Sequence, residues 1–280
     1  LSSFLVQYYE GMSVLLAEAD FYDLAMAYFE RVATQGLVYV EMFFDPQAHT
    51  SRGIAFETVI TGLRRAQDAA QELGIRSQLI MCFLRDQSVE SAFEALEQAQ
   101  DYRDWIIGVG LDSDERDNPP IKFRDVFAAA REQGYHLTMH CDVDQQDTTT
   151  HIRQCLDEIG VERIDHGSNA IEDEALVTAL VERGIGLTSC PISNSYVSDG
   201  TKAREIRALH ERGVLVTVNS DDPAYFPGYV ADNLAALQRE AELRRDEVVQ
   251  LVRNAFIISW LDKADRTNYL DRVDAWVASQ

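Results

Sequence analysis

Apolar residues along this chain gather into short continuous runs, separated by longer segments in which they recur every three or four positions. The runs are rich in β-branched and aromatic residues, as in LVYVEMFF at 37–44, and they predict β-strands. The predicted strands cover about residues 37–44, 78–84, 106–111, 135–140, 163–166, 185–190 and 214–220. Continuous rather than alternating hydrophobicity is typical of strands that are covered on both faces.

The segments between these runs have helical periodicity, and some end at a glycine, as 56–73 does at Gly74. The predicted helices cover about residues 21–35, 56–73, 88–102, 121–133, 148–159, 172–182 and 202–212. Strands that alternate with helices predict a parallel sheet in an α/β fold. Because no repeat or linker interrupts the pattern, we expect residues 1–280 to form a single domain, with C-terminal helices from about residue 230.

The number of strands leaves two architectures open. A closed (β/α)8 barrel needs eight strands, and the pattern predicts about seven. The fold is therefore either an open, doubly wound sheet or a barrel whose first strand is missing from this chain. The residues at the strand ends favour the barrel.

Histidines and acids follow several predicted strands directly. They are His140 with Asp142 and Asp144 in the loop behind it, His166, and the adjacent pair Asp221 and Asp222. A single histidine at a strand end, or an Asp before Pro, is commonly structural. In a βα barrel, however, catalytic groups sit at the C-terminal ends of several strands, so their recurrence here predicts an active site.

Other strand exits carry weaker signals. Asp112 and Ser113 follow the strand at 106–111 and can line a pocket, and so can the loop at 45–50. The CPISN segment at 190–194 is a turn signal by itself, and it predicts a loop.

Composition narrows the class of protein. With 46% apolar and 26% charged residues, the chain suits a large globular core, and no apolar run approaches a membrane span. A net charge of −22 argues against nucleic acid and against phosphorylated substrates, although a well-solvated surface explains it equally well. The four cysteines are scattered, so we expect reduced, buried thiols in a cytoplasmic protein without a membrane partner.

Five segments, taken in order, resemble one known family. They are EMFFDPQAHT, GVGLDSDERDNPP, RIDHGSNAIED, LTSCPISNSYV and VTVNSDDPAYF. The chain resembles the adenosine and adenine deaminase family of the amidohydrolase superfamily, and the FFDPQ-H-T segment is closer to the adenine branch. The resemblance implies a (β/α)8 TIM-type barrel of the metal-dependent hydrolase kind, with one Zn²⁺ per chain at the C-terminal face of the strands.

The resemblance also implies roles for individual residues. His140 and Asp221 would be zinc ligands, and His166 would be catalytic beside the metal. Asp222 would bind the purine substrate, and we place Asp112 and Ser113 with it as substrate-binding candidates. Zinc lowers the pKa of a bound water to ~7 and would so provide the nucleophile for C6 of the ring. The ligand types alone would equally allow iron or manganese.

Two features depart from the family pattern. The family has an HxH pair on its first strand, and no HxH occurs in this sequence, so we expect zinc to need the missing pair for full affinity. The family glutamate that lies three residues beyond the strand-end histidine is replaced by Val143. Asp142 or Asp144 would then be the catalytic acid, and the sequence does not choose between them.

The sequence thus predicts an enzyme that deaminates a purine at C6 by hydrolysis, acting on adenine or on an N6-substituted adenine and releasing ammonia or an amine. Adenosine stays open as a substrate, because no residue identified here reads a ribose. A protein of another class also stays open: a non-catalytic relative that binds a purine or a partner through the same pocket. The sequence leaves a homo-oligomer open as well.

Overall fold

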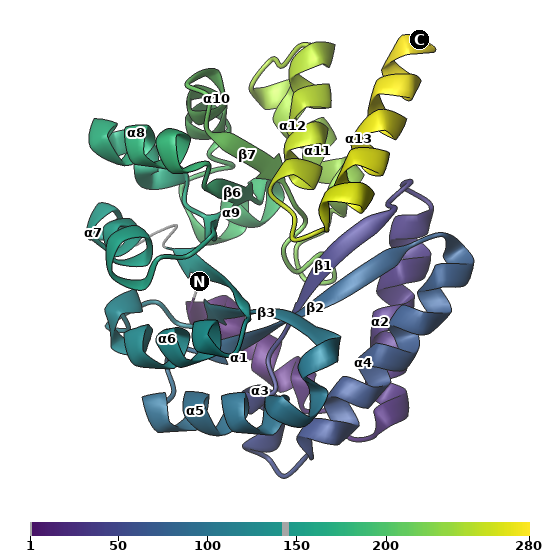
Figure 1. The fold of residues 1–280 in the computed structure, drawn as a ribbon, viewed down its shortest axis with the longest axis vertical. Coiled ribbons are helices and arrows are strands. Elements are labelled where there is room, and N and C mark those ends of the chain that lie inside the picture. The colour runs from purple at the N-terminus through teal and green to yellow at the C-terminus, as the bar shows by residue number, and fades with distance from the viewer. Residues whose placement is uncertain (1, 142–145) are drawn as a thin grey trace. The chain divides into compact units, whose positions relative to one another are not determined.

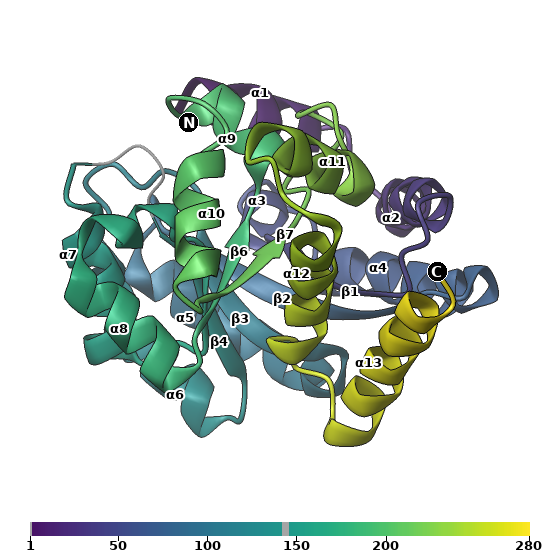
Figure 2. The ribbon, with the colours of Figure 1, turned by 90° about the horizontal axis from the view of Figure 1, so that it is seen from above.

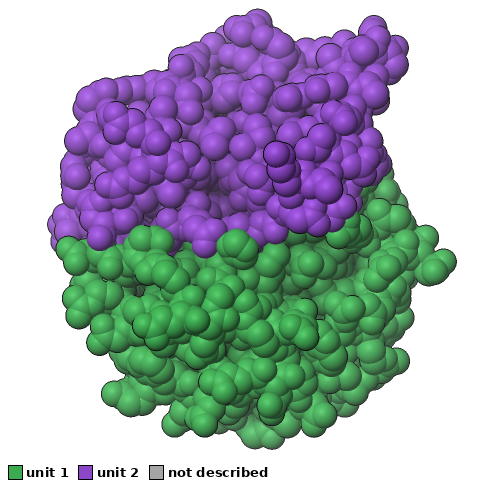
Figure 3. Space-filling model, in the orientation of Figure 1, with its two compact units in different colours: residues 1–139, 158–160 green, residues 140–157, 161–280 purple. Residues whose placement is uncertain are grey.

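A computed structural model describes residues 2–141 and 146–280 of the chain. The predicted catalytic acids Asp142 and Asp144 lie outside these residues. Figure 1 traces the elements, and Figure 3 colours the two compact units into which the chain divides. The first unit contains residues 1–139 and 158–160, and the second contains residues 140–157 and 161–280. The single domain expected over residues 1–280 stays a prediction.

The first unit alternates strands with helices. Its α-helices are α1 (Ser2–Met12), α2 (Glu18–Ala33), α3 (Gln47–Thr50), α4 (Phe56–Ala70), α5 (Val89–Gln98) and α6 (Arg124–Glu132). Its strands are β1 (Tyr39–Phe44), β2 (Arg76–Leu84), β3 (Ile106–Asp112) and most of β4 (His136–Cys141). Short 3₁₀ helices cover Gln71–Leu73, Ala99–Trp105 and Pro120–Phe123.

The strands of the first unit are parallel and adjacent in chain order. Tyr39 pairs with Arg76, Ile80 with Gly108, and Gly108 in turn with His136. Residues 79–84 of β2 are all buried, as expected for a strand covered on both faces. Parallel pairing brings the carboxyl ends of β1, β2 and β3 to one edge of the sheet.

The second unit begins at the end of β4. Its strands are β5 (Arg163–His166), β6 (Gly186–Ser189) and β7 (Leu215–Val218). Its α-helices are α7 (Thr148–Arg153), α8 (Glu174–Arg183), α9 (Pro191–Val197), α10 (Ala203–Glu211), α11 (Val230–Glu240), α12 (Arg245–Ile257) and α13 (Lys263–Ala278). A π-helical turn follows α7 at Gln154–Ile159, and a 3₁₀ helix covers Ser168–Glu172.

The three strands of the second unit are parallel and in register. Arg163 pairs with Gly186, and Gly186 pairs with Leu215. α10 and α12 both pack against β7, as Figure 2 shows. Ile258, which follows α12 directly, packs closely against β6 at Gly186. A Cβ at position 186 would lie only 2.5 Å from Cδ1 of Ile258, so this packing depends on the glycine.

These elements confirm the predicted α/β fold class, with a strand at each of the predicted positions. None of the described helices combines the length and the apolar character that crossing a membrane requires. The four cysteines are free thiols and all are buried, as predicted.

The prediction of a loop at 190–194 was wrong. Pro191 begins α9 instead, since proline suits the first turn of a helix, where its missing N–H would have no partner within the helix. The loop predicted at 45–50 also contains the short helix α3.

Candidate active site

Two strand exits of the second unit have an unusual backbone. His166 is the last residue of β5, and Asp221 lies three residues beyond the end of β7. Their φ angles are 62° and 56°, in the left-handed region that residues other than glycine rarely adopt. Strained residues of this kind are concentrated at functional sites.

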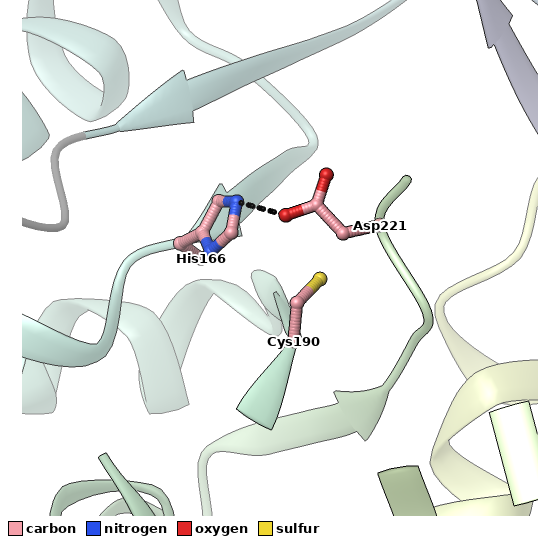
Figure 4. Close-up of side chains that lie close together, drawn as sticks. All are labelled: His166, Cys190 and Asp221. Atoms are coloured by element: carbon pink, nitrogen blue, oxygen red, sulfur yellow. Dashed lines mark ion pairs between the residues drawn. The ribbon is translucent and has the colours of Figure 1, made fainter. Parts of the chain in front are cut away.

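His166 and Asp221 face one another across this strand edge. Nε2 of His166 lies 3.5 Å from Oδ2 of Asp221, and the His166 side chain is 4% exposed (Figure 4). Nδ1 of His166 lies 3.1 Å from the side-chain oxygen of Asn194. An amide oxygen only accepts hydrogen bonds, so Nδ1 carries the proton and Nε2 is the nitrogen turned toward Asp221.

Asn194 is itself held in place. It is fully buried on α9, and its side-chain nitrogen donates to the Thr201 carbonyl at 3.4 Å. This hydrogen bond determines which end of the amide faces His166. Asn194 therefore fixes both the orientation and the tautomer of the His166 ring.

His140 completes the group of histidines. It lies next to the end of β4, and its ring centroid is 4.2 Å from that of His166, with 61° between the ring planes. Two imidazoles and a carboxylate thus converge at the ends of β4, β5 and β7, and such a group can bind a cation or transfer a proton.

The Asp221 carboxylate is stabilised in its charged form. Its burial alone would raise its pKa, but the neighbouring His166, the Ser193 hydroxyl and His140 hold that pKa below its ordinary value. Ser193 lies on α9 and donates to Oδ2 of Asp221 at 2.5 Å. Asp222 also hydrogen-bonds the Asp221 side chain, so both predicted acids belong to this site.

Cys190 was not predicted as a site residue, yet it lies within the group. Its sulfur, a ring nitrogen of His166 and a carboxylate oxygen of Asp221 all lie within 4.8 Å of one another. Burial raises the pKa of the Cys190 thiol well above its usual range, and the carboxylates of Asp221 and Asp165 raise it further. Its position directly after β6 was the sequence signal that could have identified it.

The donor types fit a borderline divalent cation. Imidazole nitrogen, carboxylate oxygen and cysteine sulfur are the ligands that zinc takes in proteins. Asp221 was predicted as a ligand and belongs to the set of three close donors. The other two members are His166 and Cys190, whereas His140 reaches the group through its contact with the His166 ring.

The substrate-binding candidates Asp112 and Ser113 lie in the first unit. Ser113 has a φ of 75° and accepts a hydrogen bond of 2.7 Å from the Tyr9 hydroxyl. Side-chain atoms of Asp112, Asp45 and Cys82 lie within 4.8 Å of one another. Burial raises the pKa of the Asp45 carboxyl, while a hydrogen bond with Asp112 partly opposes it. These residues form a polar cluster at the strand ends of that unit.

His49, in the segment at 45–50, is buried against other side chains. His49 is 5% exposed, and its ring meets that of Phe21 edge to face, with centroids 4.8 Å apart. Burial, followed by the charge of Arg52, lowers the pKa of His49 to about 4. We therefore assign His49 to the core of its unit.

Histidines and acids at the carboxyl ends of parallel strands are typical of the active sites of barrel enzymes, and residues of these types can hold a catalytic metal ion. A family model described as adenosine deaminase matches residues 1–276. The chain belongs to the adenosine deaminase family. This confirms the predicted family and the TIM-type fold, together with the enzyme class, a purine aminohydrolase.

Individual relatives are similar over nearly the whole chain. An uncharacterised deaminase of Schizosaccharomyces pombe is 51% identical over all of this chain and 83% of its own length. An adenine deaminase of Acinetobacter baylyi is 47% identical over 98% of this chain and 83% of its own. The crystal structure of an adenine deaminase from Arthrobacter aurescens superposes with a TM-score of 0.94 at 40% identity, covering 99% of this chain and 85% of that one.

Replacing Ser193 by Ala tests the local electrostatics of Asp221. We expect the free energy of unfolding at pH 7 to fall by about 1–3 kcal/mol, because a part-buried hydrogen bond to a charged group is lost. A depressed pKa means that this stabilisation is present above the pKa of an unfolded Asp, about 3.9, and is lost as the pH falls through the folded value. Urea unfolding at a series of pH values measures the difference.

Ser195→Ala is the matched control for this experiment. Ser195 is exposed on the same helix, and its hydroxyl donates only to the Ile192 carbonyl. Ser193→Ala could lower the free energy of unfolding equally at neutral pH and below pH 4, or Ser193→Ala and Ser195→Ala could lower it equally. Either result would contradict the claim that Ser193 stabilises the charged Asp221 carboxylate.

Proposed function

We propose that this chain hydrolyses the bond between C6 and the exocyclic nitrogen of adenine or of an N6-substituted adenine. The products are hypoxanthine and ammonia, or hypoxanthine and an amine. The observation that supports this best is the His166–Asp221 pair, whose ring orientation Asn194 fixes at the strand ends. The similarity to adenine deaminases over nearly the whole chain supports the free base as the substrate.

We propose that His140 and Asp221 hold one zinc ion at this site. The chemistry of the donors favours zinc, since nitrogen and oxygen donors of this kind converge within the second unit. When bound, zinc lowers the pKa of water, so that a nucleophile is available near neutral pH.

His166 takes the role of general base in this proposal. Nε2 accepts the proton of the attacking water, and Nδ1 keeps its own proton because it donates to Asn194. The carboxylate of Asp221 then stabilises the imidazolium from 3.5 Å away. Burial of the His166 ring strengthens this interaction, because water screens it less than between two fully exposed groups.

The remaining carboxylates bind and protonate the purine. Asp222 hydrogen-bonds the ring and orients it, in keeping with its position beside Asp221. Asp142 or Asp144 protonates N1 of the ring, in place of the family glutamate at the position of Val143. Protonation makes the ring a better electron acceptor, and the amine then leaves. Asp112 and Ser113 are proposed to contact the substrate as well.

The charge of the chain favours an uncharged base over a nucleotide. A net charge of −22 disfavours phosphate groups, whose own negative charge it repels. An aspartate is one methylene shorter than the glutamate it replaces, so the substrate or the backbone must shift for the proton transfer. That difference is our reason to include N6-substituted adenines.

A comparison of adenine, N6-methyladenine, adenosine and AMP tests the substrate. With added Zn²⁺ we expect hypoxanthine to form from both bases, with kcat/KM for N6-methyladenine at least equal to that for adenine, and no turnover of AMP. Exclusive turnover of adenine would contradict the N6-substituted substrate. Purine binding without turnover would instead identify a non-catalytic relative.

Neutral variants of the two candidate acids test the proton donor. We expect either Asp142→Asn or Asp144→Asn to lower kcat by about 10²- to 10⁴-fold, the usual contribution of a general acid, while the other variant changes it little. Asp147→Asn is the control, because Asp147 is exposed just beyond this segment. Unchanged kcat in both variants would exclude these residues as the acid.

A further inference from the structure

Tyr9, on α1, reaches a strand end of the first unit that lies far from it in the sequence. Its hydroxyl donates to Oγ of Ser113 at 2.7 Å, across 104 residues of the chain. Ser113 follows the last residue of β3 directly and is 8% exposed. The neighbouring Tyr8 donates to Oδ2 of Asp45 at 3.3 Å. Two adjacent residues of one helix therefore contact the polar residues at these strand ends.

The backbone on either side of Ser113 is fixed by the loop that follows β2. The Arg85 N–H donates to the Asp112 carbonyl at 3.0 Å, and Nε of Arg85 donates to the Asn118 carbonyl at 2.9 Å. The Arg85 guanidinium also lies 3.5 Å from the Glu115 carboxylate, and both side chains are fully buried. The φ of Ser113 is 75°, in the left-handed region. With the backbone held in this way, the direction of the Ser113 hydroxyl is what remains to be fixed.

Tyr9 determines which way that hydroxyl donates. A serine hydroxyl donates one hydrogen bond and can accept two. Burial raises the pKa of Tyr9 above its usual range, and the carboxylates of Asp45 and Asp112 raise it further, so the phenol keeps its proton and remains a donor. Because Tyr9 donates into Oγ of Ser113, the Ser113 proton has to point away from Tyr9.

We propose that Tyr9 is a positioning residue: by donating to Ser113, it directs the Ser113 proton toward an unprotonated ring nitrogen of the bound purine. This inference rests on the proposed function, in which Ser113 contacts the substrate. An unprotonated ring nitrogen suits this donor because it can only accept a hydrogen bond. Without the Tyr9 hydroxyl, the Ser113 proton is free to rotate toward other acceptors, and the purine must order it on binding.

A double-mutant cycle tests whether Tyr9 acts through Ser113. The ligand is hypoxanthine, the product of the proposed reaction, and calorimetry gives its Kd without turnover. We expect Tyr9→Phe to raise this Kd about 3- to 10-fold, the size of one ordinary hydrogen bond. In the Ser113→Ala background, Tyr9→Phe should change the Kd by less than about two-fold. Additive effects would overturn the proposal, because Tyr9 would then only pack against its neighbours.

Tyr22→Phe is the matched control. Tyr22 is a part-buried tyrosine of the same unit, and its ring lies against the Arg65 guanidinium, 5.2 Å away. We expect Tyr22→Phe to leave the Kd unchanged, and an equal rise in both variants would overturn the proposal. Circular dichroism confirms that each variant is folded.

Two analogues of hypoxanthine identify the acceptor. 3-Deazahypoxanthine and 7-deazahypoxanthine each carry a C–H in place of one ring nitrogen. We expect the effect of Tyr9→Phe on the Kd to disappear for one analogue and to persist for the other. An effect that persists for both would overturn the proposal, because Ser113 would then donate to neither nitrogen.

Turnover of adenine is measured separately. We expect Tyr9→Phe to raise KM in step with the Kd and to change kcat by less than about two-fold, since Tyr9 orients a binding contact. Coupled effects on hypoxanthine binding in a protein that deaminates no purine would keep the role of Tyr9 and reject the proposed deamination. Deamination with additive effects on binding would do the reverse, and a protein that binds no purine would contradict both.

Discussion

The parallel pairing of β5, β6 and β7 is the constraint on which the site depends. Asp165 lies opposite Thr188, and Thr188 lies opposite Thr217, so the three strands end together. The Thr188 hydroxyl donates to Oδ1 of Asp165 at 2.7 Å, which ties β5 to β6 just before they end. A nitrogen, a sulfur and an oxygen donor from distant parts of the sequence therefore reach one place, because register is set for the whole strand.

One short helix, α9, holds the side chains at these strand ends in position. α9 contributes Asn194, which orients the His166 ring, and Ser193, which holds the Asp221 carboxylate. The left-handed backbone at His166 and Asp221 costs free energy, and these contacts help to offset it. The site is thus positioned before any ligand arrives, which is what catalysis by electrostatic preorganisation requires.

Local pattern was sufficient to predict the seven strands, and the strand ends pointed to His140, His166, Asp221 and Asp222, which the structure brings close together while their roles stay predictions. The pattern did not identify Ser193 or Asn194, because their partners lie 28 residues away in the sequence and meet them only through strand register. It also did not reveal that Pro191 begins a helix, or that His49 packs against Phe21 in the core. Asp142 and Asp144 stay predictions, since they lie outside the described residues, and so do the roles of Asp112 and Ser113.

The central claim is that Asp221 binds the catalytic zinc, and a calorimetric titration of the metal-free protein with Zn²⁺ tests it most directly. Comparison of the unsubstituted chain with Asp221→Ala isolates the carboxylate, and Asp246→Ala, an exposed acid on α12, serves as the control. The account predicts that Asp221→Ala weakens zinc binding by at least about ten-fold, while the control leaves it unchanged. Equal zinc affinity in the unsubstituted chain and Asp221→Ala would contradict it.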